Sequence, residues 1–288
     1  MITIQQYIDD ITDAVTKKII RYTPQIYRLV EKVKKSSSPY DAIGSAVLIK
    51  LNDRYFLITA GHIISENKVG KIGFLEKGTF HILDGHFIYI NPDLDTVSKY
   101  TDLAICELDF ESQEFLTKHF DFIDGAKLNF DYQPKNDKNF LLVGFPWRKT
   151  KFNFVKQKFK VIPFKFLTDI YNNNQIGKEI ESYRDQCLVL SYPQRQIIDI
   201  KTGEKKRAVI PEGLSGCGVW HIPNIFVENI DNAIANLAGI VIRQDEFTKR
   251  YIIATRIHIV SEILRLSFDL NLKPSMISRR NGIKANIL

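Results

Sequence analysis

The first twenty residues carry a helical pattern of apolar positions. Apolar residues recur at steps of three or four, at Ile4, Ile8, Ile11, Val15 and Ile19. This spacing places them along one face of an amphipathic helix, which we predict over residues 3–21. Pro24 follows and favours an end to the helix there. The apolar stripe needs a cover, which either the rest of the chain or a partner must supply.

From Ile26 onward the pattern changes to short apolar runs separated by turn residues. Residues 46–49 and 55–59 flank an Asn52-Asp53 pair, which predicts a β-hairpin. Residues 257–266 return to helical spacing. Further strands are predicted at residues 103–108, 140–144, 158–164, 187–191, 197–200, 207–210, 237–243 and 251–255.

These elements predict an all-β dominated fold with two antiparallel β-barrels, an N-terminal helix and a C-terminal helix. The polar segment 130–139 is typical of a linker. We therefore predict an N-terminal amphipathic helix over residues 1–25 and a first β-barrel over 26–133. The second β-barrel, with the C-terminal helix and a tail, is predicted over 134–288.

Composition narrows the expected location and chemistry of the chain. No apolar run among the 288 residues is long enough to cross a bilayer, and acidic residues interrupt the apolar core that a secretory signal needs. We therefore expect a cytoplasmic protein. The chain has three cysteines, Cys106, Cys187 and Cys217. Because they are few, odd in number and far apart, they predict no disulfide framework, and neither a metal nor another cofactor is expected.

The formal net charge is +7, and the basic residues are unevenly distributed. Between Arg148 and Lys165, basic residues alternate with phenylalanines. Such a mixture can bind single-stranded nucleic acid. The same alternation over residues 156–162 is typical of a solvated strand face. Because a basic patch alone specifies no contact with bases or a groove, nucleic acid is the less favoured interpretation.

Three segments carry the residue types of a hydrolase. His62 lies just after the apolar run 55–59, Asp102 precedes the run 103–108, and Ser215 is flanked by glycines. A serine hydroxyl needs a base within hydrogen-bond reach, and the base needs a carboxylate that fixes its tautomer. We therefore predict His62 as the base, Asp102 as the orienting acid and Ser215 as the nucleophile. The backbone amides of Gly213 and Ser215 are the predicted oxyanion hole.

Two other hydrolase arrangements fit the sequence less well. The nucleophile elbow of α/β-hydrolases has a glycine two residues after the serine, where this chain has Cys217, and that fold places its histidine after the serine. Cys217 could itself be a nucleophile. No adjacent basic residue would favour its thiolate, however.

Residues 26–266 resemble the trypsin-like (chymotrypsin-fold) serine peptidases. Thr59-Ala60-Gly61-His62 is similar to the family's Thr-Ala-Ala-His segment, and Asp102-Leu103-Ala104-Ile105 to its Asp-Ile-Ala-Leu segment. Gly213-Leu214-Ser215-Gly216 is similar to its Gly-Asp-Ser-Gly segment. The resemblance implies the two-barrel fold and the same roles for His62, Asp102 and Ser215.

Departures from the family's pattern bear on regulation and specificity. Leu214 replaces the aspartate that pairs with a new N-terminus after zymogen cleavage in secreted members, and Ile63 replaces a disulfide cysteine. Both imply an intracellular, bacterial type of member. The substrate-binding wall, usually rich in Ser and Gly, reads Ile242, Arg243 and Gln244 here. Arg243 either favours an acidic substrate side chain or blocks the cleft, and Cys217 is either a redox-sensitive thiol or a buried packing residue.

The predicted function is a serine endopeptidase that cleaves a specific intracellular protein or peptide substrate through an acyl-enzyme. The likeness to stand-alone bacterial members implies a role in stress response or anti-phage defence. The alternative is a pseudopeptidase that keeps the fold and binds protein. We also expect the helix over 3–21 to dock either a regulatory protein partner or the peptidase body and to control access to the cleft. No membrane partner is expected.

Overall fold

The computed structural model describes most of the chain. The described residues are 3–30, 38–65, 70–90, 101–134, 138–153, 158–172, 180, 183–194, 197–198, 205–206 and 209–276. The tail beyond residue 276 and parts of the predicted strands 197–200 and 207–210 lie outside them.

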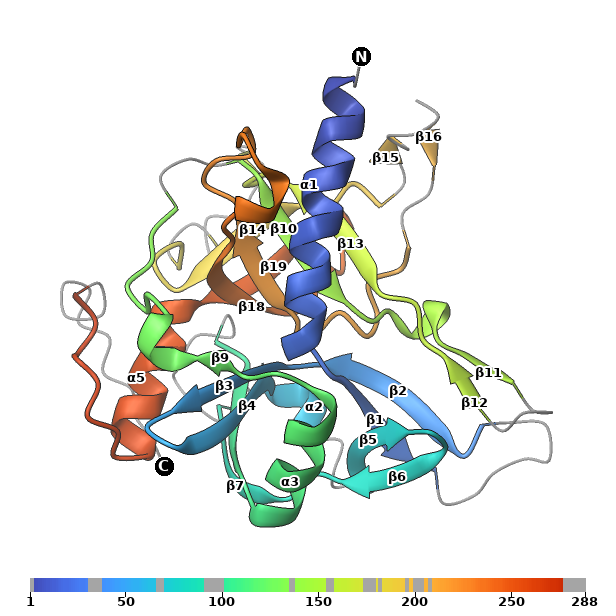
Figure 1. The fold of residues 1–288 in the computed structure, drawn as a ribbon, viewed down its shortest axis with the longest axis vertical. Helices are drawn as coiled ribbons and strands as arrows, with labels where there is room; N and C mark the ends of the chain where they lie inside the picture. Colours follow the sequence, from blue (N-terminus) through green and yellow to red (C-terminus); the bar gives the residue numbers. More distant parts are fainter. Residues whose placement is uncertain are drawn as a thin grey trace.

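The first half of the molecule, β1 to β9, forms two sheets in the lower part of Figure 1. Their strand orders are β2-β1-β5-β6 and β7-β8-β4-β3-β9. The predicted hairpin is confirmed: β3 and β4 are joined by Asn52 and Asp53, both with positive φ, as a two-residue type I′ turn requires. The bounds are β1 Gln25–Leu29, β2 Tyr40–Ser45, β3 Val47–Leu51, β4 Arg54–Ala60, β5 Ile72–Glu76, β6 Thr79–Ile82, β7 Gly85–Tyr89, β8 Leu103–Leu108 and β9 Ile123–Asp124.

The second half, β10 to β19, is built on a six-stranded antiparallel sheet of order β13-β10-β17-β18-β19-β14. The pairs β11-β12 and β15-β16 are separate two-stranded sheets. The bounds are β10 Phe140–Gly144, β11 Lys151–Asn153, β12 Lys158–Lys160, β13 Phe164–Thr168, β14 Cys187–Ser191, β15 Ile197–Ile198, β16 Lys205–Lys206, β17 Gly218–His221, β18 Asn236–Gln244 and β19 Tyr251–Arg256.

Helices precede, interrupt and close the strands. The two predicted helices are confirmed as α1 and α5, whereas α3 was not predicted. It begins where the Asp109 carboxylate accepts the Ser112 backbone N–H at 2.8 Å. No helix in the described part of the chain has the length and hydropathy needed to cross a membrane. The bounds are α1 Ile4–Ile19, α2 Gly61–Ser65, α3 Phe110–His119 and α5 Ile257–Ser267, with the 3₁₀ turns η1 Ile20–Tyr22, η3 Gly125–Lys127, η4 Trp147–Lys149 and η5 Ile230–Asn232.

Two predicted strands do not extend as far as expected. The prediction of one strand over 158–164 is wrong, because β12 ends at Lys160 and β13 begins only at Phe164. Pro163 lies between them and has no N–H for a strand ladder. Val209 and Ile210, at the end of the predicted strand 207–210, are not in a strand, and Pro211 follows them directly.

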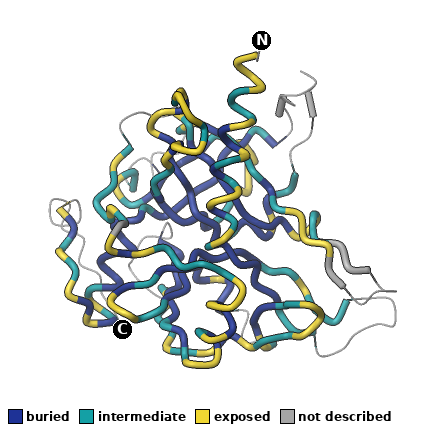
Figure 2. The backbone as a smooth tube through the Cα atoms, viewed as in Figure 1, coloured by how far each residue is buried: buried dark blue, intermediate teal, exposed yellow. Residues whose placement is uncertain are grey.

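A hydrophobic core fills the junction between the two halves, seen as the buried centre of Figure 2. Val47 of β3 packs in the same buried cluster as Leu141 of β10, Ile11 of α1 and Val260 of α5. Each half also has a smaller core of its own. The predicted fold class, β-dominated with a helix at each end, is confirmed, and the arrangement is consistent with a trypsin-like double barrel.

α1 lies against the second half of the molecule (Figure 1). Its stripe residues Ile11, Val15 and Ile19 are buried, so the chain itself covers this part of the stripe. Lys165 of β13 forms an ion pair with Asp13 of α1 at 2.8 Å. This basic residue of the 148–165 stretch is therefore engaged within the molecule.

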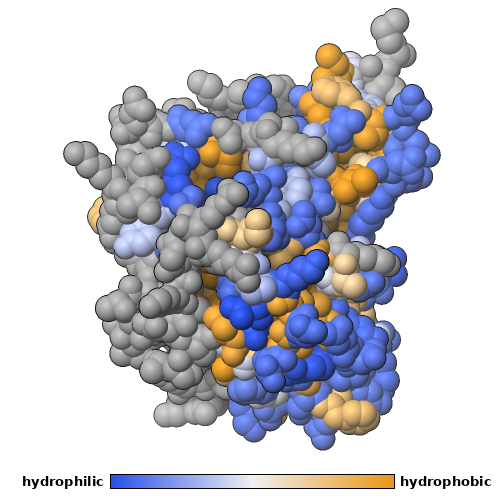
Figure 3. Space-filling view, turned by 90° about the vertical axis from the view of Figure 1, so that its left-hand side faces the viewer, coloured by the Kyte–Doolittle hydropathy of each residue, from blue (hydrophilic) through white to orange (hydrophobic). Residues whose placement is uncertain are grey.

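The other end of α1 remains exposed. Ile4 is 72% exposed, and Tyr7 stacks on Phe226, which is itself 62% exposed. The Tyr7 hydroxyl donates to the Val227 carbonyl at 2.5 Å and ties the two segments together. Figure 3 shows apolar side chains gathered at the upper right of the view.

Candidate active site

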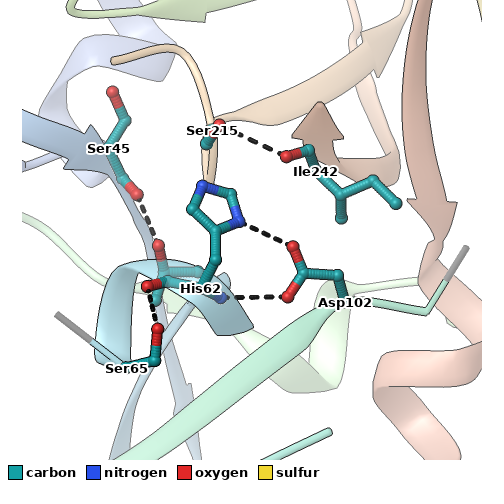
Figure 4. A network of polar contacts seen from close by, with 7 residues as sticks. Ser45, His62, Ser65, Asp102, Ser215 and Ile242 are labelled. Carbon is teal, nitrogen blue, oxygen red and sulfur yellow. Dashed lines mark hydrogen bonds and ion pairs between the residues drawn. The ribbon is translucent and has the colours of Figure 1, made fainter. Parts of the chain in front are cut away.

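α2 places His62 beside Asp102, between the end of β4 and the start of β8. His62 Nδ1 lies 2.6 Å from Asp102 Oδ2, and the His62 backbone N–H donates to Asp102 Oδ1 at 2.9 Å. The backbone N–H of Gly61 donates to the Asp102 carbonyl at 3.2 Å. Both carboxylate oxygens are thus engaged by one histidine (Figure 4).

The two side chains differ in their access to solvent. The Asp102 side chain is 11% exposed and that of His62 is 48% exposed. When Nδ1–H donates to the carboxylate, Nε2 is the acceptor of the neutral ring. In Figure 4 this far edge of the ring faces Ser215. His62 is therefore oriented to take a proton from a group at that position.

Ser215 belongs to the loop over residues 211–217, which we call the Ser215 loop. Its hydroxyl donates to the Ile242 carbonyl at 3.3 Å, and no hydrogen bond joins it to His62 within the described structure. The pairing of β18 with β19 shifts register between Val241 and Arg243, which leaves Ile242 at a bulge with its carbonyl toward Ser215. Hydrogen bonds between nucleophile and base are often unformed without substrate.

Backbone donors hold two carbonyls of the Ser215 loop. The Glu212 carbonyl accepts the Trp147 N–H at 3.0 Å, and the Leu214 carbonyl accepts the Cys217 N–H at 3.0 Å. Because the peptide group is planar and trans, fixing a carbonyl turns the next N–H to the opposite side. These two contacts thereby orient the N–H groups of Gly213 and Ser215 away from Trp147 and Cys217.

A residue of the first half holds the other two carbonyls. The Ser45 hydroxyl donates to the Gly213 carbonyl at 3.0 Å, and the Ser45 N–H donates to the Ser215 carbonyl at 2.9 Å. Among the described residues, neither the Gly213 N–H nor the Ser215 N–H has an acceptor. The N–H groups of Leu214 and Gly216 do have acceptors. Two donors on alternate residues are therefore left available beside the serine.

Two glycines allow the loop this shape. Gly213 has φ 92° and Gly216 has φ 85°, both in the left-handed region. A Cβ at Gly213 would lie 2.8 Å from the Phe145 carbonyl oxygen and from the Trp147 nitrogen. A residue with a side chain would therefore meet both strain and crowding at this position.

Two residues of the Ser215 loop that depart from the trypsin-like pattern have buried side chains. Leu214 and Cys217 are both fully buried in the core of the second half. Burial raises the pKa of the Cys217 thiol well above its usual range. Of the two interpretations of Cys217, this environment supports the buried packing residue, because a reactive thiolate needs a lowered pKa.

The three residues predicted to line the substrate wall differ in their environments. The Ile242 side chain is fully buried in a cluster with Tyr251 and Ile253, so only its backbone faces the site. Arg243 and Gln244 are half-buried on β18. Gln244 donates to the Lys249 carbonyl across the β18–β19 hairpin at 3.3 Å.

The structure thus brings His62, Asp102 and Ser215 together with the Gly213 and Ser215 amides at the junction of the halves. The part played by Ser45 was not predicted. It follows Gly44 in a small-residue run, but nothing local in the sequence indicates a contact with a residue 168 positions later. In the described ranges, no group of three His, Cys, Asp or Glu side chains is placed to hold a metal ion.

The sequence matches no protein-family model and no curated protein. Among solved structures, the fold is similar to that of a serine endoprotease from Yersinia pestis, with 14% identity and a TM-score of 0.46. The similarity covers 88% of this chain but 65% of that one, so the chain spans less than two thirds of that protein.

Proposed function

We propose that the protein is a serine endopeptidase that acts through His62, Asp102 and Ser215. The observation that carries the proposal is the Ser215 loop, whose Gly213 and Ser215 amides have no acceptor in the described structure beside the His62–Asp102 pair. Buried backbone N–H groups without a partner are uncommon in folded proteins, and Gly213 is buried. Two available N–H groups on alternate residues beside a serine can bind a developing oxyanion.

In the proposed mechanism, the Ser215 hydroxyl leaves the Ile242 carbonyl and donates to His62 Nε2. The oxygen attacks the scissile carbonyl while His62 takes the proton. Asp102 stabilises the resulting imidazolium, and the Gly213 and Ser215 amides stabilise the oxyanion. His62 then protonates the leaving amine. Water attacks the acyl-enzyme while His62 takes its proton, and His62 returns that proton to the Ser215 oxygen as the acyl group leaves.

The proposed substrate is an extended segment of a protein that runs along β18. On the side of β18 that faces β17, the ladder between these two strands ends at Ile240, two residues before Ile242. A peptide can add to such an edge through main-chain hydrogen bonds. We propose an intracellular protein as the substrate and, from the family resemblance, a role in bacterial stress response or anti-phage defence.

The test is labelling of the intact protein with an alkyl fluorophosphonate, which reacts with activated serines. The wild type should be labelled at Ser215, and the variant Ser215→Ala should fold but remain unlabelled. Comparison of proteome-wide cleavage by the two proteins should then give a set of peptides that the variant does not produce. Identical cleavage patterns would refute the proposal.

The second candidate function is a pseudopeptidase that binds protein. The contact of the Ser215 hydroxyl with the Ile242 carbonyl, in place of His62, favours it. A well-folded wild type without label, which still binds extended peptides, would support this alternative.

A further inference from the structure

Ser45 links the first half of the molecule to the loop that carries the candidate oxyanion donors. It is fully buried at the end of β2. Its hydroxyl donates to the Gly213 carbonyl at 3.0 Å and accepts the Phe145 N–H at 3.1 Å. Its own carbonyl accepts the Thr59 hydroxyl at 2.8 Å. All three polar groups of Ser45, the N–H, the carbonyl and the hydroxyl, are therefore engaged.

One of these contacts depends on the identity of the side chain. The carbonyls of Glu212, Leu214 and Ser215 are held by backbone N–H groups, which most residues can supply. The Gly213 carbonyl is held by a side-chain hydroxyl. Among these four carbonyls, the Gly213 carbonyl is therefore the one that loses its partner when a single side chain is replaced.

Gly213 is also a position at which the backbone of the loop can rotate. Glycine has the widest choice of backbone angles, and Gly213 already sits at φ 92°. The peptide group between Gly213 and Leu214 closes the turn that carries the Gly213 N–H, because the Leu214 N–H donates to the Pro211 carbonyl at 2.8 Å. Rotation of this peptide group would break that contact and loosen the turn. The Ser45 hydroxyl opposes this rotation, because without it the buried Gly213 carbonyl would lack its partner.

We propose that Ser45 is a positioning residue that keeps the Gly213 amide directed into the oxyanion site. This inference rests on the proposed peptidase function. The Ser45 contact would order the loop by a route that needs no ion pair at residue 214. Leu214 is buried in an apolar core and can form none. Ser45 contacts neither the substrate nor the reacting atoms, and it acts through the Ser215 loop.

The experiment compares the wild type with Ser45→Ala, with Ser45→Thr as the variant that keeps the hydroxyl. Ser112→Ala is the matched control, because Ser112 is also a buried serine of the first half and its hydroxyl accepts the Asp84 N–H at 3.0 Å. Two quantities are measured. The first is the alkyl fluorophosphonate reaction at Ser215, resolved into kinact and KI, and the second is amide hydrogen exchange over residues 211–217.

For Ser45→Ala we expect kinact to fall about 10- to 100-fold, up to the loss seen when an oxyanion donor is removed, with KI little changed. Exchange over 211–217 should accelerate. Ser45→Thr should recover most of kinact, and Ser112→Ala should match the wild type in both measurements. A merely structural role would lower stability without separating kinact from KI.

The outcomes separate the two proposals. A labelled wild type with Ser45→Ala equal to Ser112→Ala in kinact and exchange would overturn the role of Ser45 alone. An unlabelled wild type would overturn the peptidase function and, with it, any catalytic role for Ser45. If Ser45→Ala does not fold, a Ser45→Thr protein that folds with slow labelling and fast loop exchange would likewise overturn the assignment.

Discussion

Asp102 holds His62 at two points, through the imidazole ring and through the backbone. Oδ2 lies 2.6 Å from Nδ1, and Oδ1 accepts the His62 N–H at 2.9 Å. The backbone contact secures the first turn of α2, which carries the ring. One carboxylate therefore sets both the position of the helix and the tautomer of the base.

The variant Asp102→Asn separates these two roles. Its amide oxygen can still accept one N–H, but its NH₂ group would face Nδ1 and favour the wrong tautomer. We expect the alkyl fluorophosphonate reaction at Ser215 to slow by roughly 10⁴-fold while the fold is retained. Asp109→Asn, at the start of α3, is the control and should react like the wild type. Equal rates for the two variants would contradict the role assigned to Asp102.

The second prediction concerns the stability and reactivity of a variant at Gly216. A Cβ there would lie 2.0 Å from the Ser45 carbonyl oxygen and 2.2 Å from the Thr59 hydroxyl. We expect Gly216→Ala to lower the free energy of unfolding by more than about 2 kcal/mol, from backbone strain and steric overlap together. The loop should also lose its reaction with the fluorophosphonate.

Gly78→Ala is the matched control for Gly216→Ala. Gly78 has φ 89°, close to that of Gly216, but lies exposed in the turn between β5 and β6. It should show the backbone strain alone, about 1 kcal/mol, in denaturant unfolding. If both variants lost the same stability, the close approach of Gly216 to Ser45 would have no energetic weight.

The sequence predicted the parts of this molecule that depend on local pattern. The stripe of α1, the β3–β4 hairpin and the helix α5 follow from apolar spacing and turn residues. The break between β12 and β13 also has a local cause, Pro163, which the alternating pattern around it concealed. α3 carries the local signal Asp109, a helix cap, which the prediction did not use.

The geometry of the candidate site depends on contacts that the sequence does not encode locally. The motifs indicated which residues could form it, and the glycines indicated a tight turn. The loop that carries the Gly213 and Ser215 amides is held by donors from Trp147 and Ser45, which are distant in the chain. Only the packing of the two halves brings those donors to the loop.

The packing of α1 gives a prediction with an internal control. Ile11 is fully buried between the helix and the second half, whereas Ile4 on the same stripe is 72% exposed. We expect Ile11→Ala to lower the free energy of unfolding by about 2–5 kcal/mol and Ile4→Ala by less than about 0.5 kcal/mol. Denaturant unfolding at neutral pH measures both. Equal small effects would mean that α1 is not part of the folded core.

The last prediction concerns His258, at the start of α5, and the pH dependence of the free energy of unfolding. It is 1% exposed, and its Nε2 has no hydrogen-bond partner in the described structure. Burial and then Arg256 lower its pKa to about 4, against the opposing effects of Asp131, Asp185 and Glu262.

The sign of the His258 effect follows from which state binds the proton. The unfolded chain protonates this histidine near its ordinary pKa of 6.5, whereas the folded protein protonates it only near 4. Unfolding therefore takes up a proton between these values, and the free energy of unfolding falls as the pH is lowered through them, by about 3 kcal/mol in total. In His258→Gln this contribution is absent, so denaturant unfolding at pH 7, 5.5 and 4.5 should show a shallower loss than in the wild type. Parallel losses in the two proteins would show that His258 does not titrate in this range.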